Sequence, residues 1–337
     1  MNRPKVFISH WMPDVGVEMI KQSCEVDYYD GIVPLSKEQF IARAADADAL
    51  LIFVPDVIDA EILDHCPRVK VVSSFGKGYD NIDVEECTRR GIMVTINPDA
   101  LTDSTADLAI GLLLAVSRNL LLGDPHVRQG AFSGWHATHL LGKDFHHSKL
   151  GIIGLGSIGE AIARRAKGFD VEICYTDVTP FPEKEERLGI QYKDLDSLLA
   201  TSDFVIVAVN LMEETYHLIG EEQLMGIKTG SYLINISRGS TVDEQAVSQA
   251  LKQGKLAGYA ADVFEFEDPM NPHRPDYIPE ELIGEQAKTV FTPHIGTGTV
   301  EARNRLALSS ARQLLAALQG EQPSGAVNGV KIQALVK

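Results

Sequence analysis

The stretch LGIIGLGSIGEAIARRAKGFDVEICYTD, residues 150–177, decides the fold of this chain. Its apolar run at 150–153 predicts a buried strand, and this run leads into the glycine-rich turn GLGSIG at 154–159. Apolar residues then recur at helical spacing, and a second strand at 171–175 ends just before Asp177. A G-x-G-x-x-G turn between a strand and a helix, with an acid after the next strand, is typical of a dinucleotide-binding unit.

The residues of this turn have distinct physical roles. Gly154 permits the tight turn, Gly156 lets a pyrophosphate approach the backbone, and Gly159 lets the helix lie close to the strand. The start of the helix, at Ser157 and Ile158, presents unpaired N–H groups and a partial positive charge to the phosphates. These five residues are therefore predicted to bind the cofactor.

Asp177 indicates which dinucleotide is bound. It follows Gly159 at a distance close to the spacing of about 20 residues expected for the acid that binds the ribose. Its carboxylate would accept hydrogen bonds from the ribose hydroxyls and would repel a 2′-phosphate. No Arg or Lys occurs at 178–180 to receive such a phosphate. The sequence therefore predicts NAD as cofactor rather than NADP.

Length and charge restrict the class of protein. The chain has 337 residues, which suggests about two domains, and its formal net charge is −16. This charge argues against nucleic acid and anionic membranes as partners. The start MNRPKVFISH does not resemble a signal peptide, and the apolar run at 108–116 is too short to span a bilayer. The absence of a C-x-x-C pair indicates a cytoplasmic protein without disulfides or structural zinc, and the scattered cysteines are Cys24, Cys66, Cys87 and Cys174.

Short apolar runs alternate with amphipathic segments over the first part of the chain. This β–α alternation predicts a parallel sheet covered by helices on both faces. The expected strands are 6–8, 25–29, 50–54, 69–73 and 92–95, and the expected helices are 15–24, 37–47, 59–66 and 84–90. The region precedes the glycine turn and has no phosphate turn of its own, so we expect a separate domain of about 100 residues.

The rest of the chain completes a two-domain α/β organisation. A long apolar helix at 102–122 is expected to connect the domains, and buried strands are expected at 204–209, 231–236, 257–263 and 290–292. A last helix at 300–318 follows Thr299, a candidate N-cap, and is expected to pack on the first domain. The prediction is two doubly wound parallel-sheet domains. A flavodoxin-like substrate domain comprises 1–100 and 298–337, and a Rossmann nucleotide-binding domain comprises 101–297.

The segment 123–148 has no regular pattern and contains Trp135 and five of the ten histidines. A metal site is one hypothesis, because His136, His139, His146 and His147 lie close together in the sequence. No carboxylate or cysteine joins them at a usual ligand spacing, which favours an exposed arm or a subunit contact instead.

Four polar residues follow predicted strands, at the edge where an open α/β sheet binds its ligands. They are Lys77, Arg238, Glu267 and His294. Each alone is most often an ordinary surface residue, but their shared position at strand ends suggests one site.

Together these residues suit hydride transfer between a carbon atom and a nicotinamide. The reaction needs a group that removes or returns the hydroxyl proton, and a histidine, here His294, can do both. Glu267 would orient the imidazole and stabilise its protonated form. Arg238 offers a planar fork to a carboxylate or another oxyanion, and Lys77 adds a second cation.

At this point the sequence resembles a known family. The segments SRGSTVDE at 237–244, ADVFEFED at 261–268 and FTPHIG at 291–296, with the glycine turn, resemble the D-isomer-specific 2-hydroxyacid dehydrogenases. The resemblance implies that Arg238 binds the anionic group of the substrate, that Glu267 supports His294, and that His294 is the acid/base. It also implies a homodimer, with 123–148 as a dimerisation arm, and a deep cleft between two domains.

The resemblance also supplies further site residues. Asp262 would hold the nicotinamide carboxamide, Thr105 would lie beside the cofactor, and Lys77 and Gly78 would join Arg238 in binding a small anionic substrate. The remaining cofactor-binding positions are Asn210, Ile236 and His294. No metal is expected.

Within the family, the sequence most closely resembles the phosphite dehydrogenase branch. The similarity lies in Lys77 to Asn81, in 98–102, in Gly134-Trp135 and in the long segment from Glu267 to His294. The sequence departs from that branch at Val54, Ile236 and Leu140 or Leu141, and Asn210 stands where many relatives have a proline-containing segment.

Three functions therefore remain open. The first is an NAD-dependent dehydrogenase of a small D-2-hydroxy acid, with or without a phosphonate. The second is oxidation of phosphite to phosphate with NAD. The third is an NAD-sensing binding module, which is disfavoured because Arg238, Glu267 and His294 are all present.

Overall fold

The computed structural model describes residues 3–271 and 273–336 and divides into two compact units. Unit 1 comprises Met1–Leu101, Pro269–Pro272 and Thr297–Lys337, so it contains both ends of the chain. Unit 2 comprises Thr102–Asp268 and His273–Gly296. The short insertion of 269–272 into unit 1 is not indicated by any pattern in the sequence.

Unit 1 contains a five-stranded parallel sheet in the order β2-β1-β3-β4-β5, which is the flavodoxin-like order. The alternation seen in the sequence produces it, because each strand is followed by a helix that crosses to the next parallel strand. The strands are β1 (Lys5–Ile8), β2 (Glu25–Tyr28), β3 (Ala49–Ile52), β4 (Val71–Ser74) and β5 (Met93–Thr95); the helices are α1 (Asp14–Lys21), α2 (Lys37–Ala44), α3 (Ala60–Asp64), α4 (Val84–Arg89) and α13 (Val300–Leu318).

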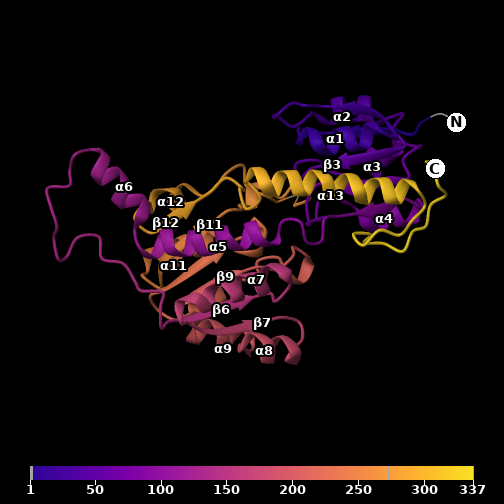
Figure 1. The fold of residues 1–337 in the computed structure, drawn as a ribbon. Coiled ribbons are helices and arrows are strands. Elements are labelled where there is room, and N and C mark those ends of the chain that lie inside the picture. Colours follow the sequence, from indigo (N-terminus) through magenta and orange to yellow (C-terminus); the bar gives the residue numbers. More distant parts are fainter. Residues whose placement is uncertain (1–2, 272, 337) are drawn as a thin grey trace. The chain divides into compact units, whose positions relative to one another are not determined.

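The C-terminal helix α13 packs against α1 (Figure 1) and against β4 within unit 1. Thr299 is its N-cap, as predicted, and the Thr299 hydroxyl accepts a hydrogen bond from the backbone N–H of Ala302 at 3.0 Å. The two helices approach closely because Gly16 has no side chain. A Cβ atom at Gly16 would lie 2.6 Å from the carbonyl oxygen of Ala307.

Unit 2 contains a seven-stranded sheet in the order β12-β11-β10-β9-β6-β7-β8, and every pair of neighbours is parallel. The order in which strands are added to the sheet reverses between the neighbouring strands β6 and β9, as in a Rossmann fold. The strands are β6 (Lys149–Ile153), β7 (Glu172–Thr176), β8 (Gln191–Tyr192), β9 (Phe204–Val207), β10 (Ser231–Asn235), β11 (Leu256–Ala261) and β12 (Thr289–Phe291). The prediction of an α/β fold with two parallel sheets is confirmed.

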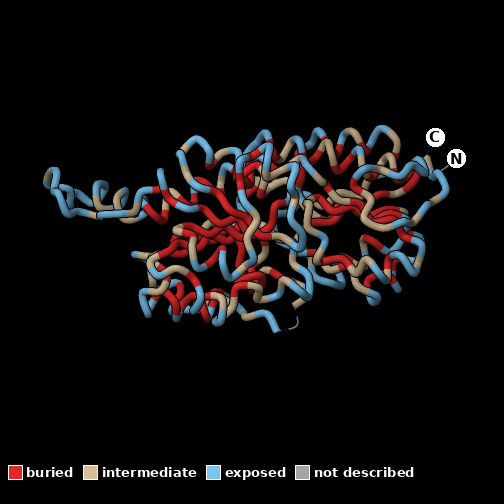
Figure 2. Tube along the Cα trace, turned by 90° about the horizontal axis from the view of Figure 1, so that it is seen from below, coloured by how far each residue is buried: buried red, intermediate tan, exposed pale blue. Residues whose placement is uncertain are grey.

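The helices of unit 2 cover both faces of its sheet. Two hydrophobic clusters form the core, one on each face, and Figure 2 shows buried segments in the interior with exposed segments around them. The α-helices are α5 (Thr102–Ser117), α6 (Leu120–Arg128), α7 (Ser157–Ala166), α8 (Pro182–Leu188), α9 (Leu195–Thr201), α10 (Glu221–Gly226), α11 (Glu244–Lys252) and α12 (Glu280–Gly284). The 3₁₀ turns are η1 (Lys167–Phe169), η2 (Glu213–Thr215), η3 (Gly239–Thr241) and η4 (Glu265–Glu267).

The prediction of one helix over 102–122 is wrong. Helix α5 ends at Ser117, and α6 runs from Leu120 to Arg128 at an angle of 66° to it. The break occurs because Asn119 adopts the left-handed conformation, with φ of 55°, which an asparagine tolerates better than most residues. In the part of the chain that is described, no single helix is long and apolar enough to cross a membrane; only the bent pair of α5 and α6, taken together, passes on length and composition.

The arm, defined as residues 123–148, extends away from the rest of unit 2 (Figure 1) and is mostly exposed (Figure 2). Its exposed apolar side chains include Val127, Phe132, Trp135 and Leu141, and Trp135 is 84% exposed. The four cysteines, in contrast, are all buried and have free thiols.

Candidate functional site

The glycine turn lies at the carboxyl end of β6, and the backbone around it requires a glycine at 154 and at 159. Gly154 has φ of 94°, and a Cβ there would also lie 2.6 Å from the carbonyl oxygen of Ala208. A Cβ at Gly159 would lie 2.0 Å from the carbonyl oxygen of Gly154. Gly156 differs, because a Cβ there would enter open space at the N-terminus of α7. An open approach to backbone at a helix N-terminus fits the pyrophosphate of a dinucleotide.

Asp177 joins the end of β7 to this turn. Its Oδ2 accepts a hydrogen bond from the backbone N–H of Leu155 at 2.7 Å, and its Oδ1 accepts one from Val178 at 2.8 Å. Each carboxylate oxygen has a further lone pair, so the side chain can still accept from ribose hydroxyls. The ribose-binding role of Asp177 is thus compatible with a second role in holding the glycine turn.

His294 and Glu267 form a hydrogen-bonded pair. His294 Nδ1 lies 2.8 Å from Glu267 Oε2, and the other carboxylate oxygen of Glu267 accepts a hydrogen bond from the backbone N–H of Phe264 at 2.9 Å. Glu267 is therefore held at both oxygens. A carboxylate at Nδ1 favours the tautomer with the proton on that nitrogen, which leaves Nε2 to exchange a proton with a substrate.

Asp262 holds the turn that carries His294. Its Oδ1 accepts hydrogen bonds from the Thr292 hydroxyl at 2.6 Å and from the N–H of Ile295 at 2.8 Å, and its Oδ2 accepts one from Gly296 at 2.7 Å. His294 itself has φ of 52°, a conformation that these bonds impose. Burial raises the pKa of Asp262, while the Thr292 hydroxyl and the backbone N–H groups act in the opposite direction.

Arg238 lies in the loop between β10 and η3, and its backbone is fixed by neighbouring side chains. Its carbonyl oxygen accepts hydrogen bonds from Asn235 Nδ2 at 2.9 Å and from the Thr241 hydroxyl at 2.7 Å. The next residue, Gly239, packs directly against the backbone of η4, where a Cβ would lie 1.8 Å from the carbonyl carbon of Phe264. The segments that carry Arg238 and Glu267 therefore touch.

The remaining cofactor-binding candidates of unit 2 occupy different environments. Thr105, on α5, lies near Asp262, because a Cβ at Gly296 would be 3.3 Å from Thr105 Oγ1 and 3.2 Å from Asp262 Oδ2. Ile236 has its side chain in the hydrophobic core, whereas Asn210 is exposed and its carbonyl oxygen accepts a hydrogen bond from the Thr215 hydroxyl.

Lys77 and Gly78 belong to unit 1 and follow β4, as predicted from the sequence. The Ser74 hydroxyl orders this loop, since it accepts a hydrogen bond from the N–H of Gly76 and donates one to the carbonyl oxygen of Gly78, both at 3.1 Å. Burial lowers the pKa of Lys77, and the negative charge of Asp99 partly offsets this effect.

The sequence reasoning missed three buried or half-buried titratable residues near the site: His217, Glu244 and Glu265. Glu244 and Glu265 occur inside the segments SRGSTVDE and ADVFEFED, but neither follows a strand end in the manner of Arg238 or His294. Charged residues in such segments are usually solvated, so only their burial in the structure distinguishes them.

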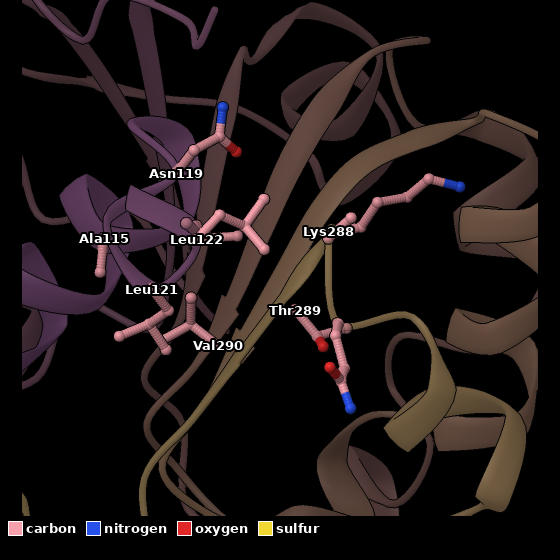
Figure 3. Close-up of a pocket in the computed structure, with 10 residues that line it drawn as sticks. Ala115, Asn119, Leu121, Leu122, Lys288, Thr289 and Val290 are labelled. Carbon is pink, nitrogen blue, oxygen red and sulfur yellow. The ribbon is translucent and has the colours of Figure 1, made fainter. Parts of the chain in front are cut away.

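Of two pockets, one borders the candidate site residues and the other does not. One lies beside the base of the arm, where Asn119, Leu121 and Leu122 are near Lys288 and Val290 (Figure 3), and no candidate site residue lines it. The other is lined by Phe264, Phe266, Glu267, Tyr277, Ile278 and Pro293 and is therefore adjacent to the His294–Glu267 pair. Among residues 3–271 and 273–336, no three His, Cys, Asp or Glu side chains are grouped so that they could hold a metal ion.

Comparison with known proteins gives consistent similarities. Residues 110–296 match the family model of the D-isomer specific 2-hydroxyacid dehydrogenase NAD binding domain. A glyoxylate reductase from Thermococcus gammatolerans is 43% identical over 97% of this chain and 96% of that protein. A crystal structure from Thermus thermophilus superposes with a TM-score of 0.86 at 34% identity, over 96% of this chain and 100% of that one. An NADPH-dependent glyoxylate/hydroxypyruvate reductase from Sinorhizobium meliloti, in complex with NADP and malonate, has a TM-score of 0.85 at 29% identity, over 98% and 99% of the two chains.

Proposed function

We propose that this chain, which belongs to the D-isomer-specific 2-hydroxyacid dehydrogenases, reduces glyoxylate to glycolate with NADH. Its family membership makes it an NAD(P)-dependent oxidoreductase. Hydroxypyruvate is the second substrate we propose. The observation that carries the proposal is the His294–Glu267 pair at 2.8 Å, which forms the acid/base unit that carbonyl reduction needs. The Thermococcus relative is named a glyoxylate reductase, which supports the choice of glyoxylate as substrate.

The proposed roles follow from the geometry. A bound nicotinamide supplies the hydride that adds to the carbonyl carbon. As the carbonyl oxygen gains negative charge, His294 Nε2 donates a proton to it, and the carboxylate of Glu267 stabilises the imidazolium form that precedes this transfer. The Arg238 guanidinium binds the carboxylate of the substrate through two parallel N–H···O bonds. In the reverse direction His294 removes the proton from the hydroxyl group.

A substrate panel tests this proposal directly. Purified protein is mixed with NADH and glyoxylate, hydroxypyruvate or pyruvate, and NADH consumption is followed by absorbance; NADH formation from NAD and phosphite is run in parallel. We expect rapid consumption with glyoxylate and hydroxypyruvate. The named relatives reported above are glyoxylate reductases, which gives no support to the resemblance to the phosphite branch. Reduction of NAD by phosphite without reaction of any 2-oxo acid would refute the proposal.

We also propose NAD as the preferred cofactor, and the substitution Asp177→Asn tests it. An amide removes the charge that repels a 2′-phosphate but keeps an oxygen that can accept from Leu155 or Val178. A charge at about 4 Å in a partly exposed site is worth about 1–4 kcal/mol, so kcat/KM for NADPH relative to NADH should rise about 10-fold or more.

The matched control for this experiment is Glu186→Gln, which removes an exposed carboxylate from α8, the helix after β7. Its ratio of kcat/KM values should equal that of the unaltered protein. A protein that already prefers NADPH, like the Sinorhizobium relative, would contradict the assignment of NAD.

A homodimer built on the arm is the proposed assembly. The arm exposes Phe132 and the indole of Trp135, and such apolar surface on an extended segment usually contacts another protein. The double substitution Phe132→Ser with Trp135→Ser should lower the mass measured by sedimentation equilibrium from two chains to one. A mass of one chain for the unaltered protein, across the concentrations used for assays, would contradict the proposal.

A further inference from the structure

A group of buried carboxyl side chains contacts the loops that carry Arg238 and Glu267. These loops form η3 and η4, which are in contact through Gly239. Beside this contact, the backbone N–H of Ser240 in η3 donates a hydrogen bond of 2.7 Å to Asp268 Oδ2, immediately after η4. The relative position of Arg238 and Glu267 therefore depends on how η3 and η4 are held together.

Glu244 and Glu265 join η4 to the start of α11, the helix that follows η3, by reciprocal hydrogen bonds. The backbone N–H of Glu244, at the start of α11, donates to Glu265 Oε1 at 3.0 Å. The backbone N–H of Glu265, in η4, donates to Glu244 Oε1, also at 3.0 Å. Glu244 is 1% exposed and Glu265 is 7% exposed, so solvent screens neither carboxyl group.

In the described part of the chain, the two carboxyl groups differ in their side-chain partners. Glu265 Oε2 lies 2.9 Å from His217 Nε2, and the backbone N–H of His217 donates to the carbonyl oxygen of Ser240 at 2.7 Å. The pKa of His217 is raised, chiefly by its hydrogen bond with Glu265. Glu244 Oε2, in contrast, is buried and has no hydrogen-bond partner in the described part of the chain.

The neighbouring carboxylates oppose the ionisation of Glu244. Electrostatic interactions couple Glu244 to His217 and to the carboxylates of Glu265, Glu267 and Asp268, and from β11 it faces the buried phenol of Tyr259. On the neighbouring helices α10 and α12 the glutamates point to solvent; these are Glu221, Glu222, Glu280 and Glu281. Burial raises the pKa of Glu244 to about 8; the hydrogen bond from the backbone N–H of Glu265 acts in the opposite direction, and the charges of the three carboxylates add to the rise.

We propose that Glu244 and Glu265 form a carboxyl clasp that positions Arg238 and Glu267 for the reaction, and that Glu244 acts in it as a neutral, protonated group. The clasp rests on the proposed roles of Arg238 and Glu267, but neither carboxyl group needs to touch the substrate. His217 is the third member, because its ring makes a hydrogen bond with Glu265 and its backbone N–H makes one with Ser240 in η3.

The clasp makes the stability of unit 2 depend on pH in a defined direction. The pKa of Glu244 is raised from 4.5 in the unfolded chain to about 8 in the folded one. The folded protein therefore binds this proton more tightly, and the resulting stabilisation is complete below pH 4.5 and is lost as the pH rises to about 8. Above that pH a second negative charge would lie beside Glu265.

Two substitutions at Glu244 separate positioning from simple packing. Glu244→Gln keeps the oxygen that accepts from the N–H of Glu265 and is neutral at every pH, so it mimics the protonated acid. Glu244→Ala removes that hydrogen bond. We expect the Gln variant to retain the turnover of the unaltered enzyme at pH 7, and the Ala variant to lose about 10²-fold in kcat, the typical cost of misplacing reacting groups by about 1 Å.

The decisive readout is thermal unfolding as a function of pH. The unfolding midpoint of the Gln variant minus that of the unaltered protein should increase from pH 5 to pH 8 and then remain constant. Glu222→Gln, an exposed control on α10, should show no such increase. A difference that is the same at every pH, or an Ala variant with unaltered kcat, would overturn the clasp. Unfolding requires no substrate, so this test stands even if glyoxylate is not reduced and the proposed function fails.

Discussion

Replacement of His294 by asparagine should lower kcat for glyoxylate by about 10²–10⁴-fold, because this is the usual contribution of a general acid or base. Asparagine is the informative substitution at this position. The backbone of residue 294 has φ of 52°, and asparagine adopts that conformation more readily than alanine does. The turn is also held by Asp262 through residues other than His294, so its shape should persist.

The measurement combines steady-state kinetics with a titration of NADH binding by fluorescence. We expect the dissociation constant of NADH to change little, since the proposed phosphate and ribose sites are the glycine turn and Asp177. His65→Ala, on the exposed C-cap of α3, is the matched control and should leave kcat unchanged. A kcat within a factor of about two of the unaltered enzyme would remove His294 from the acid/base role, because such a change is far below the expected range.

The parts of the fold that the sequence predicts are those determined by local patterns. The glycine turn is recognisable because Gly154 and Gly159 satisfy steric limits set by residues near them in the same βαβ unit. The N-cap at Thr299 is local for the same reason. The helix at 102–122 was misjudged because its apolar pattern continues through Asn119, while the left-handed conformation of that single residue ends α5.

The candidate site shows a similar division. His294 and Glu267 could be paired in advance because each follows a strand, and adjacent strand ends meet at one edge of a sheet. The reciprocal bonds of Glu244 and Glu265 could not, because they depend on the contact between η3 and η4, which brings together segments distant in the sequence. Sequence patterns report strand ends well, but they do not report which buried charges face each other.

Replacement of Arg238 by alanine should reduce kcat/KM for glyoxylate by about 10²–10⁴-fold. A hydrogen bond to a charged group contributes about 1.5–3 kcal/mol, and the proposed fork makes two such bonds with the substrate carboxylate. The loop should keep its shape, because Asn235 and Thr241 bind the backbone carbonyl of Arg238 and not its side chain. Arg238→Lys, which keeps the charge but loses the fork, should show an intermediate loss.

An uncharged substrate tests whether Arg238→Ala lowers kcat/KM because the bonds to the substrate carboxylate are lost. Glyoxal has the same size as glyoxylate and an aldehyde in place of the carboxylate, so its reduction does not use the Arg238 fork. If Arg238 binds the carboxylate, Arg238→Ala should erase most of the preference for glyoxylate over glyoxal and leave the rate with glyoxal nearly unchanged. The exposed Arg187→Ala serves as control and should preserve the preference. Equal losses with both compounds would instead mean that Arg238 shapes the site as a whole, and the carboxylate would then need another partner.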